Sequence, residues 1–136
     1  MAAVTELIRK DEGNTISFGD HTLETKAKVE DFDVAGNLYK VKTYKQLTKL
    51  ERDGMFVYES EPGTSVNGFE VLENGVSFTV CGNEDAMITV GLKEDTEYNV
   101  VIGDREIGKI KTNLGGKLSF SVELEGKGEI KIKVVE

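Results

Sequence analysis

The residues on which common catalytic and metal sites depend are scarce in this chain of 136 residues, which contains one Cys, one His and no Trp. The single cysteine, Cys81, excludes an internal disulfide bond. Cys81 and His21 together are too few to supply the ligands of most zinc or iron sites. His21 would also have to serve any Ser-His or Cys-His machinery, so we expect no catalytic residues of these classes and no cofactor.

Long apolar runs and an excess of positive charge are missing as well. No stretch approaches the roughly 20 apolar residues of a membrane-spanning helix, and residues 1–10 lack the apolar segment of a secretion signal. The formal net charge of −8 argues against nucleic acid and anionic membrane surfaces as partners. We therefore expect a soluble, cytoplasmic protein that binds neither nucleic acid nor membrane.

Proline is equally scarce, and its one position marks the clearest break in the chain. Pro62 lies in the run Glu61-Pro62-Gly63-Thr64-Ser65, which is typical of a loop. The length of the chain predicts a single domain over residues 1–136. The break suggests that this domain is sub-divided into an N-terminal β extension, residues 1–65, and a β-sandwich, residues 66–136.

Alternation of apolar and polar side chains is abundant in the last third of the chain. Residues 117–124 and 130–134 alternate strictly, which is the period of a strand with one face in water. The glycine-containing gap at 126–128 predicts that these two strands form a β-hairpin. In residues 106–111 the isoleucines fall out of phase around Gly108, which predicts a β-bulge.

The whole segment from Val66 onward follows a similar plan. It reads as seven short strands, and turn signals recur roughly every 8–12 residues. One of these signals is the dipeptide Asn74-Gly75, which predicts a hairpin. This spacing is typical of an antiparallel β-sandwich.

The N-terminal half is less regular. Residues 4–10 are compatible with an edge strand or with a turn of helix, and the sequence does not decide between them. Residues 16–18 alternate as a short strand, and the polar run 21–33 predicts a strand, an irregular bend and a second strand. Residues 38–44 are rich in β-branched and aromatic side chains, which favours a further strand.

Residues 45–53 admit two interpretations. Three apolar side chains are three residues apart, as in a helical turn: Tyr44, Leu47 and Leu50. The following Asp53-Gly54 instead indicates a hairpin with a type I′ turn. We favour the hairpin because nine residues are few for a stable helix. The next run, 55–58, is apolar on both faces, which indicates a central strand or a strand that meets a partner subunit.

Residues 91–98 carry a local resemblance. The run Gly-Leu-Lys-Glu-Asp-Thr-Glu-Tyr resembles the fibronectin type III pattern Leu-x-Pro-x-Thr-x-Tyr, although Glu94 stands where proline is usual. The resemblance implies a Greek-key sandwich in which the Tyr98 hydroxyl bonds back to upstream backbone, as a tyrosine corner. At least three strands follow the one that carries Tyr98, against about two in a fibronectin type III domain. We therefore expect a related sandwich and not a true member of that family.

Two longer runs, 48–64 and 108–124, resemble small uncharacterised clostridial all-β proteins, some of which carry an automatic endosialidase label. The resemblance extends over most of the chain and implies a bacterial source. Through the label it implies action on a glycan, but no catalytic motif of the endosialidases matches a position in this sequence. Residues 91–136 also resemble the β-sandwich tails of polysaccharide-degrading enzymes, where such tails are accessory modules.

A few residues are candidates for a ligand site. Tyr44, out of phase with its strand neighbours, and Tyr58, in the run that is apolar on both faces, offer rings that could stack on a sugar. His21 follows the Gly19-Asp20 turn, where we expect it at the surface. The loop of Asn83, Glu84 and Asp85 is the best candidate for calcium, although it lacks a long Asp-x-Asp-x-Asp-Gly pattern.

Cys81 is expected to be an inert thiol, because no basic residue lies near it in the sequence to lower its pKa.

These patterns predict an all-β fold, an antiparallel β-sandwich of fibronectin/immunoglobulin-like type with the N-terminal β extension packed on it. Because the residues for common catalysis are absent or solitary, we expect a non-catalytic binding or structural module that self-associates as a homo-oligomer. The alternative is a glycan-acting enzyme that uses a pair of carboxylates, or a carbohydrate-binding accessory protein, with a glycan as the partner.

Overall fold

The structure, a computed structural model that describes residues 3–136, consists almost entirely of antiparallel strands. The strands of the described residues are, in chain order, β1 (Ile8–Lys10), β2 (Ile16–Phe18), β3 (Ala27–Val34), β4 (Asn37–Tyr44), β5 (Leu47–Arg52), β6 (Met55–Glu61), β7 (Ser65–Leu72), β8 (Gly75–Cys81), β9 (Ala86–Gly91), β10 (Glu97–Ile102), β11 (Arg105–Lys111), β12 (Lys117–Val122) and β13 (Ile130–Val135). A short 3-10 helix, η1 (Glu12–Asn14), joins β1 to β2.

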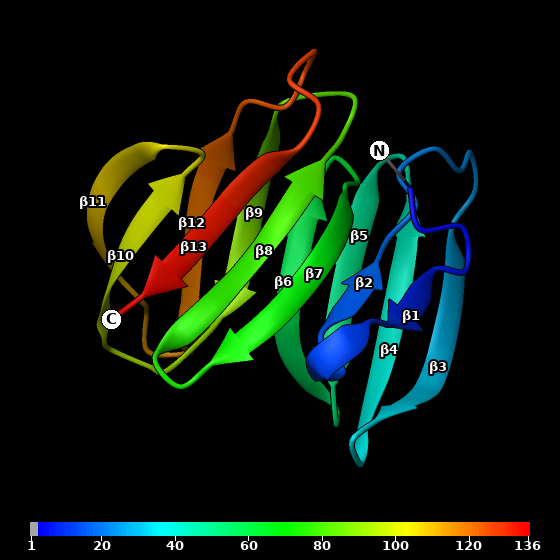
Figure 1. The fold of residues 1–136 in the computed structure, drawn as a ribbon, viewed down its shortest axis with the longest axis horizontal. Coiled ribbons are helices and arrows are strands. Elements are labelled where there is room, and N and C mark those ends of the chain that lie inside the picture. The colour runs from blue at the N-terminus through cyan, green and yellow to red at the C-terminus, as the bar shows by residue number, and fades with distance from the viewer. Residues whose placement is uncertain (1–2) are drawn as a thin grey trace.

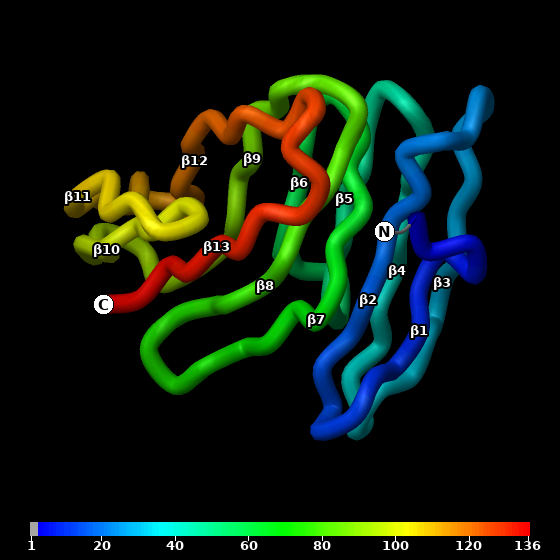
Figure 2. Tube along the Cα trace, turned by 45° about the horizontal axis from the view of Figure 1, so that its top comes forward, coloured from blue at the N-terminus to red at the C-terminus, as the bar shows by residue number. Residues whose placement is uncertain are grey.

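The strands form two sheets that pack face to face, which confirms the predicted all-β sandwich. Sheet A has seven strands in the order β1-β2-β7-β8-β13-β10-β11, and sheet B has six in the order β12-β9-β6-β5-β4-β3. Figure 1 shows sheet A in front of sheet B, and the turned view in Figure 2 shows the two layers from another side. Within residues 3–136, no helix has the length and apolar character needed to span a bilayer.

Both sheets draw strands from either side of Pro62. The residues before it supply β1 and β2 of sheet A and β3 to β6 of sheet B. The residues after it supply the other five strands of sheet A and complete sheet B with β9 and β12. Because β2 pairs with β7 and β6 pairs with β9, the sandwich is not confined to residues 66–136, and residues before the break are integral to it.

The β5–β6 connection is the hairpin favoured for residues 45–53. Asp53 and Gly54 form its turn with φ angles of 52° and 80°, the left-handed region that a type I′ turn requires at both central positions. The alternative helical turn is therefore wrong. Residues 8–10 likewise form a strand, β1, which lies at the edge of sheet A.

The run that is apolar on both faces belongs to a central strand. β6 lies between β9 and β5 in sheet B, so both of its edges are paired. A register shift opposite Leu50 and Glu51 interrupts the pairing of β5 with β6. The irregularity turns both Val57 and Tyr58 inward, where they are 8% and 0% exposed.

The predicted hairpin around residues 126–128 is wrong. β12 pairs with β9 in sheet B, whereas β13 pairs with β8 and β10 in sheet A. The segment between them therefore crosses from one sheet to the other. Alternation shows which side of a strand faces the core, but both sheets bury one face, so the pattern alone does not identify a strand's partner.

Two further predictions are adjusted by the structure. The polar run 21–33 contains one strand, β3, and its first six residues form the crossing from sheet A to sheet B. The hairpin signalled by Asn74-Gly75 exists, but Leu72 pairs with Gly75, so the turn residues are Glu73 and Asn74. Gly75 lies within β8, where a Cβ atom would collide with the carbonyl oxygen of Val134 in the neighbouring strand. Close approach of two backbones, and not the turn, requires this glycine.

The tyrosine corner inferred from residues 91–98 is present. Tyr98 is buried, and its hydroxyl oxygen accepts a hydrogen bond from the backbone N–H of Lys93, at 3.2 Å. The predicted bulge at Gly108 is present too, because the β10–β11 register shifts there.

Four aromatic rings form the centre of the core between the sheets. Tyr58 of sheet B makes edge-to-face contacts with Phe18 and Phe78 of sheet A, with ring centroids 5.3 Å and 5.6 Å apart. Phe69 stacks on Phe78 at 5.5 Å. Each buried ring of this kind contributes on the order of 1.5–3 kcal/mol to folding.

One end of the sandwich, where β5 begins and β6 ends, is closed by a buried network of hydroxyl groups; we call it the closed end. Thr64 Oγ1 lies 2.8 Å from the Tyr58 hydroxyl and 2.7 Å from Ser60 Oγ. Thr48 Oγ1 donates to the Thr64 carbonyl at 2.7 Å and accepts from the Thr64 N–H at 3.1 Å. Thr43 Oγ1 extends the network from Thr48 to the N–H of Asp20. All four hydroxyl residues, Thr43, Thr48, Ser60 and Thr64, are fully buried.

Candidate ligand-binding groove

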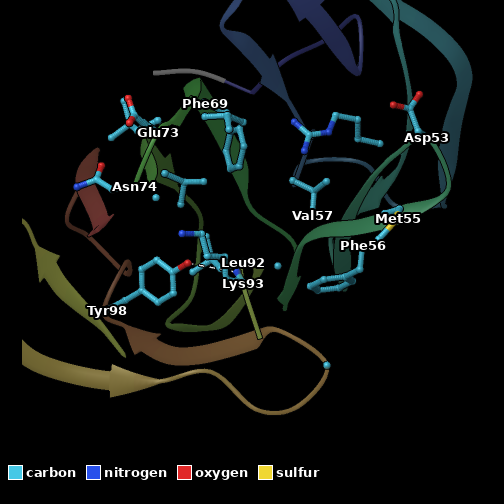
Figure 3. A pocket seen from close by; sticks show the side chains of 17 residues that line it. Asp53, Met55, Phe56, Val57, Phe69, Glu73, Asn74, Leu92, Lys93 and Tyr98 are labelled. Atoms are coloured by element: carbon cyan, nitrogen blue, oxygen red, sulfur yellow. Dashed lines mark hydrogen bonds between the residues drawn. The ribbon is translucent and has the colours of Figure 1, made fainter. Parts of the chain in front are cut away.

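The opposite end of the sandwich is open and forms a groove of about 620 Å³. One side carries Met55, Phe56 and Val57 of β6, and the turn between β7 and β8 faces it (Figure 3). Leu92 and Tyr98 line a third side, near the tyrosine corner. Most of this lining is apolar, and it comes from segments far apart in the sequence.

The groove exists because the sheets do not cover each other completely at this end. Val71 lies two residues after the buried Phe69, on the same face of β7, yet 52% of its surface is exposed. Met55, at the start of β6, is 70% exposed. Apolar side chains that meet no opposing sheet leave an apolar rim, which is typical of binding surfaces.

Arg52 is the residue that gives this groove a chemical preference. It follows Thr48 and Leu50 at the alternating inward positions of β5, and both of these neighbours are fully buried. Arg52 itself is half-buried and lines the groove together with an adjacent hollow of about 210 Å³. Its side chain makes no hydrogen bond or ion pair with any residue of the described chain, 3–136.

An unpaired guanidinium at an apolar groove is suited to an anion. Arginine has five N–H donors in a planar fork, and a carboxylate can accept two of them side by side. The nearby carboxylate of Asp53 is held elsewhere, because its Oδ1 accepts a hydrogen bond from the Leu38 N–H at 2.8 Å. The arrangement therefore leaves the Arg52 guanidinium open to a ligand from solution.

Lys93 is the other cation that lines the groove, and it is already paired. Its Nζ donates to Glu136 Oε1 at 3.0 Å, and this hydrogen bond raises the pKa of Lys93. Its backbone N–H is bound to Tyr98. Arg52 is thus the available positive charge among the groove residues that the structure describes.

His21 lies at a turn, as expected, but it is buried and not at the surface, with 9% exposed. Ser65 Oγ accepts from the His21 N–H at 3.3 Å and lies 2.7 Å from Nδ1. The imidazole and the hydroxyl therefore share a hydrogen bond, and which of the two donates depends on the tautomer of the ring. Burial lowers the pKa of His21, while the charge of Asp20 raises it by less.

The His21–Ser65 pair does not have the geometry of a nucleophile and its base. Ser65 is 0% exposed, so no substrate reaches its hydroxyl. The Asp20 carboxylate accepts from the N–H and hydroxyl of Thr22, and is not hydrogen-bonded to the imidazole. A triad needs that third contact to orient the base.

The two candidate tyrosines have different environments. Tyr58 is fully buried in the core, and burial raises its pKa. Its ring therefore presents no face to a ligand in solution. Tyr44 is half-buried at the closed end, where its hydroxyl donates to Gln46 and the Lys26 ammonium lies 5.7 Å from its ring centroid. Neither residue lines the groove.

The candidate calcium loop also lies at the closed end. Asp85 Oδ1 accepts hydrogen bonds from the N–H groups of Leu124 and Glu125, at 3.0 Å and 3.2 Å. Asp85 therefore anchors the crossing from β12 to β13. Asn83 and Glu84 are exposed, and within residues 3–136 no three His, Cys, Asp or Glu side chains cluster in a way that could hold a metal ion.

Cys81 is buried, as an inert thiol would be, and burial raises its pKa.

Sequence reasoning missed Arg52. The signal was present in the alternation of β5, where Thr48, Leu50 and Arg52 share one face. A charged residue at an inward position either finds a partner or marks a site. The sequence did not show which, because the groove walls come from other strands.

Comparison with protein-family models finds no match to this chain, and comparisons with curated proteins and with solved structures find none either.

Proposed function

We propose that the protein is a non-catalytic binding module whose open-end groove holds a small organic anion. The carboxylate of the ligand pairs with Arg52, and an apolar arm lies against Phe56, Val71 and Leu92. The observation that carries this proposal is the half-buried Arg52, whose guanidinium has no hydrogen-bond or ion-pair partner within residues 3–136, beside apolar side chains that no opposing sheet covers. A buried or half-buried charge of this kind is normally paired.

The two parts of the ligand contribute different amounts of binding free energy. Each methylene that leaves water contributes about 0.8 kcal/mol, so the apolar arm supplies affinity. A hydrogen bond to a charged group is worth about 1.5–3 kcal/mol, which corresponds to roughly a 10- to 100-fold change in Kd. Arg52 therefore sets the preference for an anion over a neutral ligand of the same length.

Calorimetric titration with octanoate, octanol and acetate tests this division. Octanoate is expected to bind most tightly, because it alone has both parts. In Arg52→Gln the affinity for octanoate should fall by about 10- to 100-fold, while the affinity for octanol stays the same. Arg105→Gln, on the exposed strand β11, removes a charge away from the groove and is the matched control. Equal octanoate affinity in the wild type and Arg52→Gln would refute the proposal.

An acidic glycan is the second candidate ligand. In this candidate the same guanidinium donates to the carboxylate of a sialic acid, and a sugar ring lies along the groove wall. Titration with oligosialic acid beside octanoate separates the two candidates, with Arg52→Gln as the common control. Chromatography of the glycan after incubation then distinguishes binding from cleavage.

A further inference from the structure

The hollow of about 210 Å³ that adjoins the groove at Arg52 has polar groups of its own; we call it the side hollow. It lies between the turn that joins β3 to β4 and the residues of η1. Arg52, Phe69 and Val71 line both the groove and the side hollow. The two cavities therefore lie side by side at these three residues.

Tyr39 is the side chain that accompanies Arg52 in the side hollow. In the pairing of β4 with β5, Tyr39 lies directly opposite Arg52. The preceding inward pair on these strands, Val41 and Leu50, is fully buried. Tyr39 and Arg52 continue this inward column, and side chains so paired have Cβ atoms about 4.5–5.5 Å apart. Both residues line the side hollow.

The hydroxyl of Tyr39 has no hydrogen-bond partner within residues 3–136, although the residue is only 6% exposed. Every fully buried side-chain N or O atom of the described residues has a partner, so this hydroxyl oxygen reaches water. The side hollow is thus lined by two residues whose donors meet no acceptor of the described chain, Tyr39 and Arg52. Unsatisfied polar groups at such a position call for an explanation, and a bound ligand supplies one.

Glu70 is the one carboxylate among the described residues that line the side hollow. It is exposed, and it makes no ion pair with any residue of the described chain. Its position on β7 alternates with the inward Phe69, so its charge faces water and is screened. The negative charge that Arg52 needs therefore comes from outside the chain.

We propose that the side hollow is the head-group subsite of the ligand. The carboxylate accepts hydrogen bonds from the Arg52 guanidinium and from the Tyr39 hydroxyl, and the apolar arm passes Phe69 and Val71 into the groove. This inference rests on the function proposed above, and it adds a second recognition residue and a ligand class, the aliphatic carboxylic acids. An ionised carboxylate has two acceptor oxygens and no donor, so it satisfies both side chains at once.

A neutral head group of the same shape fits this subsite less well. A primary amide has one acceptor oxygen and an NH₂ group with two donors, which would face the donors of Arg52 and Tyr39. Hydrogen bonds to a neutral acceptor are also weaker than those to a charged one. Octanamide, which matches octanoate in length and head shape, should therefore bind less tightly than octanoate.

Calorimetric titration of Tyr39→Phe with octanoate tests the subsite. The variant keeps the ring and removes the hydroxyl, so the affinity for octanoate should fall by about 10-fold. The affinity for octanamide should fall by less, because its head carries no charge. Tyr44→Phe removes a hydroxyl at the closed end; as the matched control it should bind octanoate as the wild type does.

A blocking variant tests the position of the head group without removing either donor. Asn37 is two residues before Tyr39 on the same face of β4, and it lines the side hollow but not the groove. Asn37→Phe should fill the hollow and weaken octanoate binding by at least about 10-fold, since the lost hydrogen bonds are to a charged group. Leu38→Phe, on the exposed face of the same strand, is the matched control.

The possible results separate this inference from the function on which it rests. Urea unfolding first confirms that each variant folds. Unchanged octanoate affinity in either Tyr39→Phe or Asn37→Phe, together with weaker binding in Arg52→Gln, would overturn the inference and leave the proposed function standing. The carboxylate would then lie on the groove side of Arg52. Unchanged octanoate affinity in Arg52→Gln would overturn both.

Discussion

The two ends of the sandwich differ in whether the polar groups near the core have hydrogen-bond partners. At each end the chain turns back between strands, and polar groups lie close to the core. At the closed end Thr43, Thr48, Ser60 and Thr64 form a network in which every hydroxyl has a partner. At the open end Arg52 lies at an inward position without any partner in the described chain.

This difference separates stability from binding. Among the described residues no buried side-chain N or O atom lacks a hydrogen bond, so every buried hydroxyl group of the closed end has a hydrogen-bond partner. A satisfied network of this kind makes the native packing unique, whereas an unpaired cation adds nothing to folding. We therefore expect substitutions at the closed end to change the free energy of unfolding, and substitutions at Arg52 to change ligand affinity.

The strongest test of the contrast is Thr64→Val. The substitution keeps the shape of the side chain but removes the hydroxyl that contacts both Tyr58 and Ser60. Two buried hydroxyls lose a partner, and each unmet group costs about 1–3 kcal/mol. We expect the free energy of unfolding, measured in urea, to fall by about 3 kcal/mol.

Thr89→Val is the control for this change. Thr89 shares a hydrogen bond with Ser119 on the exposed face of sheet B, where water replaces a lost partner. Its cost should be below about 0.5 kcal/mol. If Thr64→Val and Thr89→Val lower the free energy of unfolding by similar amounts, the closed-end network does not stabilise the fold more than an exposed hydrogen bond does.

A smaller effect is expected for Tyr98→Phe, which removes the tyrosine corner beside the groove. The Lys93 N–H loses its acceptor, but it lies near the surface, where water can partly replace the bond. The free energy of unfolding should fall by about 1 kcal/mol. A Tyr39→Phe variant is the matched control, because Tyr39 is also buried and none of the hydrogen bonds described for the chain involves its hydroxyl. A cost for Tyr98→Phe no greater than that of Tyr39→Phe would contradict the prediction.

The closed end should also carry a weak dependence on pH through His21. Its pKa is lowered in the folded state by burial, whereas in the unfolded chain it is about 6.5. Above that pH the imidazole is neutral in both the folded and the unfolded state, so His21 causes no loss of stability. As the pH falls below about 6.5 the unfolded state binds the proton first, so stability is lost until the pH passes the folded pKa.

His21→Asn isolates this contribution, since its neutral side-chain amide has both a donor and an acceptor for Ser65. Urea unfolding from pH 7.5 to 5 should show a shallower loss of stability in the variant than in the wild type. Identical slopes would mean that burial does not disfavour the charged imidazole.

The smallest change in stability is expected for Arg52→Met. No native hydrogen bond or ion pair is lost, and the new side chain is apolar like its surroundings, so the free energy of unfolding should stay within about 0.5 kcal/mol or rise. Arg9→Met is the contrasting variant, because Arg9 bonds Asp11 at 3.1 Å and Asn67 at 3.3 Å. A larger loss for Arg52→Met than for Arg9→Met would show that Arg52 stabilises the fold.

Features that depend on near neighbours in the chain were predictable from the sequence. The Asp53-Gly54 turn and the tyrosine corner of residues 91–98 are set by the conformations that a few adjacent residues allow. The inward and outward faces of β12 and β13 follow from strict alternation. The all-β class followed from the sum of such local signals, since the two segments compatible with a helical turn, 4–10 and 45–53, are short for a stable helix.

Tertiary structure alone decided which of these elements meet. β12 and β13 look alike in sequence but belong to different sheets, because alternation is the same for any strand with one buried face. The burial of His21 depends on Ser65, 44 positions away, and the Thr48–Thr64 bonds join β5 to the start of β7. Arg52 is a candidate site because the walls around it come from β6, β7 and the β9–β10 loop. Contacts between segments far apart in the sequence form because packing of the whole core lowers the free energy. No single segment encodes that packing.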